Sequence, residues 1–205
     1  MNRIFRLVWN KKQARYVVAS EAAMSHKAGA TKLSKGIASL LALLVGIMSS
    51  GASYAVDPNA LPTNPQVTHG AASIDQNANT LTINQQTDKL ITNWSTFNIG
   101  GDAKVQFIQP NSASTALNRI NSSDPSYIAG SLSANGKIIL INPNGVLFAN
   151  GARVDTAGII ASTLNLTDQN FINNNFVFEK DGIAATISNS GELRAFVGGV
   201  VALIA

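Results

Sequence analysis

Few side chains in this 205-residue chain could carry out chemistry. A hydrolytic or metal site needs clustered acids and histidines, or a nucleophile beside a base. From Val56 onward the only histidine is His69, no acid follows it until Asp75, and the remaining acids are scattered without a pair that recurs at a regular interval. No glycine-rich phosphate loop follows a strand and opens a helix. The sequence therefore predicts no enzyme active site, no bound cofactor and no metal site.

Two further groups of residues have ordinary explanations. Asn-x-Ser/Thr sequons begin at Asn93, Asn121 and Asn165, and the high content of Asn, Ser and Thr would produce about three of them by chance. Trp94 and Phe97, in the segment NWSTFNIG, are predicted to be core or cap aromatics rather than a platform for a ligand. Neither group indicates a binding site.

The most specific local signal is ILINPNGVLFANG (139–151), in which Asn142-Pro143-Asn144-Gly145 separates two short apolar runs. The proline fixes its own φ and pushes Asn142 into extended geometry, while Asn144 and Gly145 can take the positive φ that follows. The segment is thus a stiff turn, either the tip of a hairpin or a corner of a repetitive fold. The flanking runs are apolar at nearly every position, which suits strands buried on both faces and favours the corner. An exposed turn can also carry recognition.

The positive charge of the chain is concentrated at its N-terminus. Eight of the fifteen basic residues precede Gly36, where the only acid is Glu21, whereas residues 56–205 hold seven basic and ten acidic side chains. The net charge of that later part is about −3, too little positive charge to follow a phosphate backbone. We therefore expect no nucleic-acid partner.

The basic region is followed by an apolar run of thirteen residues, Gly36–Met48, which is too short to span a bilayer comfortably. The small residues Ser53 and Ala55 then stand three and one positions before Val56. This order is typical of a secretory signal peptide, so we expect residues 1–55 to be an extended signal peptide and Val56 to begin the mature protein. The absence of cysteine suits an exported chain that must stay unfolded while it crosses a second barrier.

The mature part consists of a proline-rich start and a series of short apolar runs. Residues 56–66 are predicted to form an extended linker, with the folded domain at 67–205. No long segment of the domain has apolar residues at helical spacing. The runs predict strands of about five residues. They are TLTI (80–83), KVQFI (104–108), KIILI (137–141), GVLFA (145–149), GIIAST (158–163), FVF (176–178) and VVALIA (200–205).

Glycines separate these strands at intervals too short for a strand, a helix and another strand. Two all-β folds remain, an antiparallel sandwich and a parallel β-helix. The pattern ANGKI (134–138) returns 22 residues later as TAGII (156–160) and again as NSGEL (189–193). The mature part is also rich in Asn, whose amide can hydrogen-bond to stacked copies of itself at solenoid corners. The repetition favours the β-helix.

Together these segments resemble a known family. The leader MNRIFRLVWNKKQARYVVASE (1–21) resembles the extended signal-peptide region of large exported bacterial proteins. The segments VTHGAASI, ITNWSTFNIG, ALNRI, LSANGKIILINPNGVLFANGARVDTAGIIAST and NSGEL resemble the two-partner secretion domain of the filamentous-haemagglutinin family, closest to its high-molecular-weight adhesin branch. The resemblance implies an all-β fold, a right-handed parallel β-helix with an N-terminal β cap. It also implies export through an outer-membrane β-barrel transporter whose periplasmic domains recognise the module.

The family's Asn-Pro-Asn-Gly secretion motif falls on Asn142, Pro143, Asn144 and Gly145. The resemblance implies that changes at these residues impair secretion or folding. A second family motif, Asn-Pro-Asn-Leu, has no clear match, and NSSDPSYIAG (121–130) stands roughly in its place.

The leading hypothesis is an N-terminal secretion-targeting and fold-nucleating domain of a large adhesin-like exoprotein. Such a protein would pass through the periplasm and be secreted from, or displayed on, a Gram-negative bacterium, with host-cell contact left to distal regions. The alternatives are the export module of a haemolysin or contact-dependent toxin, and, less favoured, a β-helix polysaccharide-degrading enzyme. The apolar end GGVVALIA has no polar cap, so we expect the natural chain to continue past Ala205.

Overall fold

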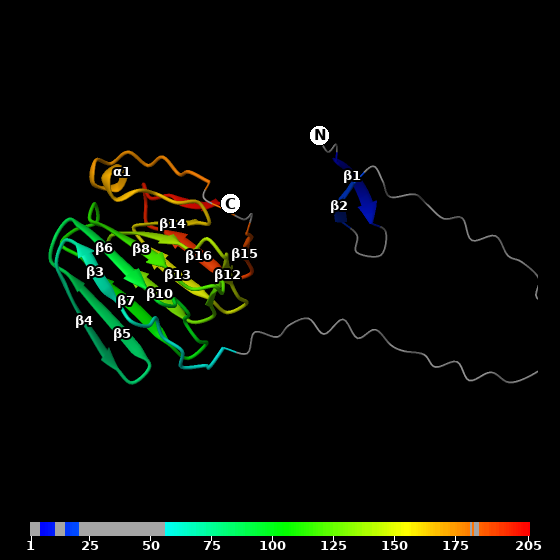
Figure 1. Ribbon diagram of the computed structural model, residues 1–205. Helices are drawn as coiled ribbons and strands as arrows, with labels where there is room; N and C mark the ends of the chain where they lie inside the picture. The colour runs from blue at the N-terminus through cyan, green and yellow to red at the C-terminus, as the bar shows by residue number, and fades with distance from the viewer. Residues whose placement is uncertain (1–4, 11–14, 21–55, 181, 183–184) are drawn as a thin grey trace, which may run out of the picture. The chain divides into compact units, whose positions relative to one another are not determined.

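The computed structural model describes residues 5–10, 15–20, 56–180, 182 and 185–205. The chain divides into two units, Met1–Ser50 and Gly51–Ala205. In the first unit β1 (Phe5–Asn10) pairs antiparallel with β2 (Arg15–Ser20) (Figure 1). Within the described residues no helix is long and apolar enough to cross a membrane. Two residues of the predicted cleavage site, Ser53 and Ala55, lie outside the described residues.

The second unit winds through three β-sheets (Figure 1). Sheet one contains, in spatial order, β16 (Glu192–Ala195), β13 (Arg153–Thr156), β10 (Ser131–Ala134), β7 (Lys104–Ile108), β5 (Thr80–Gln85) and β4 (Ala72–Asn77). Sheet two contains β17 (Val201–Ile204), β14 (Gly158–Ser162), β11 (Lys137–Ile141), β8 (Thr115–Ile120), β6 (Lys89–Trp94) and β3 (Gln66–His69). Sheet three contains β15 (Ile187–Asn189), β12 (Val146–Phe148) and β9 (Ser126–Ile128).

The direction of the strands identifies the fold. From β5 and β6 onward, every neighbouring pair in the three sheets is parallel, and successive strands of one sheet come from successive coils. The two N-terminal strands differ, because β4 pairs antiparallel with β5 and β3 pairs antiparallel with β6. They cover the first coil and so form an N-terminal β cap. The predicted all-β parallel β-helix with an N-terminal cap is confirmed.

The coil length agrees with the sequence repeat in one sheet and departs from it by one residue in the next. In sheet one Ser131 pairs with Arg153, 22 positions later, as the repeat predicts. In sheet two Lys137 pairs with Gly158, only 21 positions later, so the later corner is one residue shorter. The NSGEL segment (189–193) enters β16 of sheet one rather than a strand of sheet two. Its match to ANGKI therefore does not reflect equivalent places in two coils.

Sheet two is buried on both faces. Ile138 and Leu140 of β11 point into the main core that fills the coils, whereas Ile139 and Ile141 of the same strand point outward into a second apolar cluster. All four are at most 2% exposed. This arrangement explains why KIILI has no polar position after its lysine, since a strand with a single buried face would alternate. Sheet one does alternate between exposed and buried side chains, as in β7, where residues 104, 106 and 108 face solvent.

The second cluster is covered by a segment that leaves the coil after β14. It includes the one helix in the described residues, α1 (Asp168–Ile172), whose N-cap Thr167 accepts a hydrogen bond from the Asn170 backbone. The predicted strand at FVF (176–178) is wrong, because these residues run without strand pairing. Their high β propensity is overridden by their place in this covering segment, where Phe178 packs onto the cluster.

Residues 56–66 were expected to be an extended linker, and the structure differs. The Ala60 carbonyl accepts a hydrogen bond from Gly100, the Pro58 carbonyl accepts one from Asp102, and Thr63 bonds to Thr96. Leu61 is buried in the main core. The prolines remove backbone donors but leave carbonyls free to accept, so the segment is tied to the body and only its last residue, Gln66, joins a sheet, as the start of β3.

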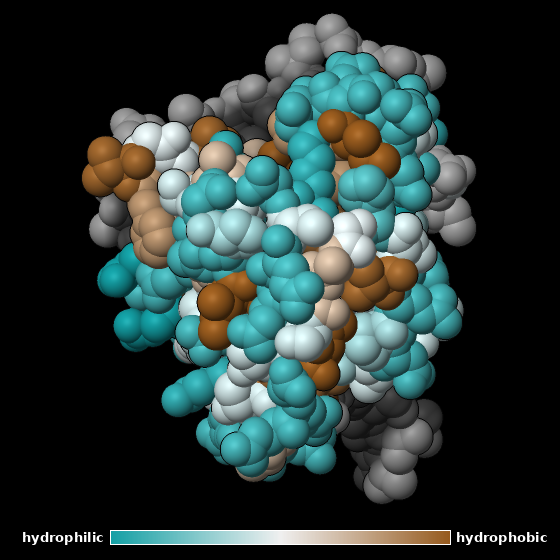
Figure 2. Space-filling view, turned by 90° about the vertical axis from the view of Figure 1, so that its left-hand side faces the viewer, coloured by the Kyte–Doolittle hydropathy of each residue, from teal (hydrophilic) through white to brown (hydrophobic). Residues whose placement is uncertain are grey.

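The exterior is largely polar. Figure 2 shows one face on which hydrophilic residues predominate and hydrophobic residues form separate patches. The arrangement follows from the alternation of strands such as β5 and β7, whose outward positions are polar or charged with the exception of Ile108.

Candidate functional site

The Asn142–Gly145 segment forms a corner between sheets. It joins β11 of sheet two to β12 of sheet three, and the Gly145 backbone N–H donates to the Asn142 carbonyl at 3.0 Å, which closes a four-residue turn. Pro143 occupies the second position, where its fixed φ suits such a turn. Only Gly145 takes a positive φ, +113°, and Asn144 does not. The segment is therefore a corner of the solenoid, as expected, and not the tip of a hairpin.

Asn142 is fully buried and its side chain fixes the corner to the preceding coil. Its Nδ2 donates to the Asp124 carbonyl at 3.1 Å and to the Ser126 hydroxyl at 3.0 Å. Its Oδ1 accepts from the Asn144 backbone N–H at 2.9 Å, which adds an Asx turn to the backbone turn. Every polar atom of this side chain is thus bonded within the protein.

Asn144 and Pro143 form the exposed part of the same corner. Asn144 Nδ2 donates to the Ser122 carbonyl at 2.7 Å, so this exposed residue is also held to the preceding coil. Ser122 belongs to the preceding corner, where its Oγ accepts from the Asp124 backbone N–H at 2.9 Å. The segment that stands in place of the missing Asn-Pro-Asn-Leu motif therefore supplies the acceptors for both asparagines.

The following coil closes on the other side of the corner. The Asn142 backbone donates to the Ser162 carbonyl at 3.0 Å, and the Val146 backbone donates to the Thr186 carbonyl at 3.3 Å. A Cβ placed on Gly145 would lie 2.8 Å from that Thr186 oxygen. The four-residue motif is therefore in contact with the coils before and after it, and its glycine is required both by φ and by space.

A groove of about 230 Å³ lies beside the preceding corner. Its lining joins the predicted mature terminus to that corner and to sheet three: Val56, Asn98, Asp124, Pro125, Tyr127 and Leu147. Asn98 Oδ1 accepts from the Tyr127 backbone at 2.8 Å, which holds this wall in place. Val56 is thus located near the corner that binds Asn142.

The other residues that the sequence singled out are structural. Trp94 is 1% exposed, donates from Nε1 to Asn118 Oδ1 at 3.0 Å and meets Phe97 edge-on at 5.4 Å, as predicted for core aromatics. His69 lies at the end of β3 in the cap. Within the described residues no group of His, Cys, Asp and Glu is arranged to hold a metal ion.

A second polar corner, between sheets one and two, could not be assigned to particular residues from the sequence. Gln109 Nε2 donates to Gln85 Oε1 at 3.0 Å, and Gln109 Oε1 accepts from the Gly136 backbone at 2.9 Å. Asn135 exchanges two hydrogen bonds of 2.7 Å with the Gln109 backbone. The three amide side chains come from successive coils and form a ladder of hydrogen bonds. The ladder ends at the next coil, whose corner is one residue shorter and has Ala157 in place of an amide side chain. Stacked amides were expected at corners, but the enrichment in Asn did not identify the two glutamines.

Comparison with known proteins agrees with this geometry. Residues 59–205 match the family described as TPS secretion domain, and residues 1–50 match the Extended Signal Peptide of Type V secretion system. The crystal structure of the HMW1 secretion domain from Haemophilus influenzae has a TM-score of 0.61 and 39% sequence identity, covering 63% of this chain and 35% of that one.

Two curated relatives are each named heme/hemopexin-binding protein. One, from Haemophilus influenzae, is 36% identical over 142 residues, and the other, from strain ATCC 51907 / DSM 11121 / KW20 / Rd of that species, is 38% identical over 127 residues. The matches cover 69% and 62% of this chain but only 15% and 14% of the relatives, so the chain spans a small part of their length.

The two family matches account for both units of the chain, the leader and the β-helix. A leader of this kind followed by a TPS secretion domain indicates passage through the periplasm and secretion by a Gram-negative bacterium. The chain belongs to the family of TPS secretion domains and carries the extended signal peptide of the type V secretion system.

Proposed function

We propose that residues 56–205 are the secretion-targeting and fold-nucleating domain of a large adhesin-like exoprotein. The partner is an outer-membrane β-barrel transporter whose periplasmic domains bind the Asn142–Gly145 corner. One observation carries this role: Asn142 is buried and fully hydrogen-bonded, whereas Pro143 and Asn144 are exposed on the same turn. A rigid exposed turn can be recognised at low entropic cost.

The stack of coils supports the nucleating role. Each strand of sheet two pairs in parallel with the strand of the coil before it, so a formed coil provides the edge on which the next one assembles. The antiparallel cap covers the first coil and gives this growth a closed start. Folding outside the cell can then proceed in one direction without an energy source beyond the inner membrane.

The distal part of the exoprotein would contact the host-cell surface. A second candidate for it is binding of heme or hemopexin, because the relatives with 36% and 38% identity have names that describe this activity. A toxin or haemolysin would carry the same export module. A β-helix polysaccharide-degrading enzyme is the less favoured alternative, because the acids of the mature sequence form no pair that recurs at coil spacing.

The first prediction separates recognition from folding. Asn144→Ala removes one exposed side chain and one hydrogen bond, so we expect about a three- to tenfold fall in secretion with little loss of stability. Asn142→Ala leaves the Ser126 hydroxyl and the Asp124 carbonyl without their partner, so we expect it to lower secretion and stability together. The matched control is Asn150→Ala, an exposed asparagine at the next corner.

The measurement is the ratio of secreted to cell-associated protein in cells that carry the transporter, with circular dichroism and urea unfolding of each purified variant. Normal secretion of a folded Asn144→Ala protein would remove the corner from the recognition surface. An equal fall for Asn150→Ala would show that the assay responds to any corner asparagine.

A further inference from the structure

The segment from Leu164 to Glu179, which we call the strap, folds back over coils that precede it in the chain. Its base is closed by Asn165 and Glu179, whose backbones exchange two hydrogen bonds of 2.9 Å. Between these residues the strap carries α1 and crosses the outer face of sheet two (Figure 1). The strap therefore lengthens its coil, since Val146 pairs with Ile187 41 positions later but with Ser126 only 20 positions earlier.

The strap is attached to the sheet by side chains. Leu166 and Phe171 pack on Ile91, Leu117 and Ile139, which come from three earlier coils. In the described residues no backbone hydrogen bond joins the strap to β6, β8 or β11. A surface held in this way can separate without breaking any ladder of the sheet.

Two basic side chains from early coils bind the strap. Lys89 of β6 donates from Nζ to the carbonyls of Phe171, at 2.9 Å, and Ile172, and lies 5.5 Å from the centre of the Phe171 ring. Arg119 of β8 donates to the Leu166 carbonyl and forms an ion pair with Asp168. The two cations bind acceptors at the two ends of α1. Both precede these acceptors in the chain, by 47 to 83 positions, so they emerge before the strap does when the chain is threaded from its N-terminus.

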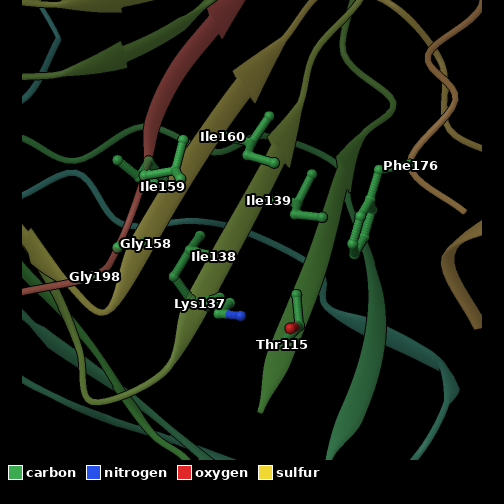
Figure 3. A pocket seen from close by; sticks show the side chains of 11 residues that line it. Thr115, Lys137, Ile138, Ile139, Gly158, Ile159, Ile160, Phe176 and Gly198 are labelled. Carbon is green, nitrogen blue, oxygen red and sulfur yellow. The ribbon is translucent and has the colours of Figure 1, made fainter. Parts of the chain in front are cut away.

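The two ends of the strap are packed differently. Phe171 is fully buried, whereas Phe176 and Val177 are each 45% exposed. Beneath Phe176 there is a groove of about 250 Å³, lined in part by Thr115, Lys137, Ile139 and Ile160 (Figure 3). Phe176 and Val177 are therefore loosely packed, whereas Phe178 beside them packs on the second cluster.

We propose that the strap is a latch that opens and closes as a unit on coils that are already folded. The outer face of sheet two beneath it is then the last surface of the early coils to become covered. When it opens, it uncovers the apolar outer face of sheet two at Ile91, Leu117 and Ile139, while the main core stays closed. Local opening of this kind is expected where few backbone bonds tie a segment to the rest of a structure.

Because the chain contains no cysteine, single introduced thiols can report on this opening. Leu90 and Ile91 are both fully buried and are neighbours on β6, but Leu90 belongs to the main core and Ile91 lies under the strap. In the purified protein under native conditions, the thiol of Ile91→Cys should react with a thiol reagent at least about tenfold faster than that of Leu90→Cys. Equal rates, with the same dependence on denaturant, would overturn the proposal, since both thiols would then be reached only by global unfolding.

A second substitution tests the anchor. Adding Asp168→Asn should raise the labelling rate of Ile91→Cys by about two- to fivefold, the effect of losing a partly exposed ion pair, and leave Leu90→Cys unchanged. The matched control is Glu192→Gln, which breaks the exposed pair with Arg194 in sheet one and should alter neither rate. A rise at both cysteines with Asp168→Asn would mean that the strap and coils open together, which contradicts a latch.

Discussion

Asn142 and Asn144 are two residues apart and of the same type, yet the structure gives them different tasks. Asn142 has no exposed surface and bonds to the preceding corner through Asp124 and Ser126. Asn144 reaches the same corner at Ser122 but remains exposed. The turn itself could be predicted, because Pro143 and Gly145 act through their own backbones. The division between the asparagines could not, because it depends on a coil some 20 residues away.

At this scale we predict that Gly145→Ala lowers the free energy of unfolding by about 1–3 kcal/mol. The residue has a φ of +113°, and an added Cβ would meet the Thr186 carbonyl oxygen at 2.8 Å. Gly101→Ala is the matched control, because a Cβ there meets nothing within 4 Å. Urea unfolding of both variants checks the prediction, and a Gly145→Ala protein as stable as the control would contradict it.

Among the elements, those with a repeated pattern were the easiest to predict. KVQFI and KIILI coincide with β7 and β11, since alternation and continuous burial both follow from where a strand lies in the coil. FVF failed because its propensity is local, whereas its conformation is set by the strap. The linker prediction for residues 56–66 was wrong for a related reason. A high proline content indicates a backbone with few donors, but it does not show that the carbonyls of this segment accept hydrogen bonds from Gly100 and Asp102.

The amide ladder between sheets one and two leads to a prediction for an element. Gln109 is 5% exposed and links coils through Gln85 and Gly136, so Gln109→Ala should lower the free energy of unfolding by about 2–3 kcal/mol. Gln106→Ala, three residues earlier on β7 and facing solvent, should change it by less than about 0.5 kcal/mol. Thermal or urea unfolding distinguishes them, and equal effects would mean that the ladder contributes no stability.

For the whole molecule, the parallel stack of coils and its cap could be predicted from the repeated sequence pattern and from the family resemblance. The strap was not, because it occurs once and has no counterpart in the other coils. Likewise, the candidate recognition corner was identified by its motif, while its contacts with the Ser122–Asp124 turn required the register of neighbouring coils. Sequence periodicity predicts what is repeated, and the single insertion must be seen in three dimensions.

The remaining prediction concerns processing. We expect the secreted protein to begin at Val56, because the small residues Ser53 and Ala55 stand three and one positions before it, after the apolar run Gly36–Met48. Mass spectrometry of the N-terminal peptide from culture medium checks this directly. Ala55→Leu, which places a bulky side chain at the cleavage site, should abolish that peptide. An N-terminus upstream of Gly36 in the secreted protein would contradict the signal-peptide assignment.

The parallel winding also has a consequence for time. In every parallel strand pair of the β-helix, the paired residues are at least 20 positions apart, because a whole coil separates them. Folding rates fall as the mean sequence separation of contacts increases, so such a chain folds slowly compared with a helical bundle of the same length. A slow-folding polypeptide remains threadable during its stay in the periplasm. Slow folding would therefore keep this chain unfolded until export, a task that a holding chaperone performs for proteins that fold faster.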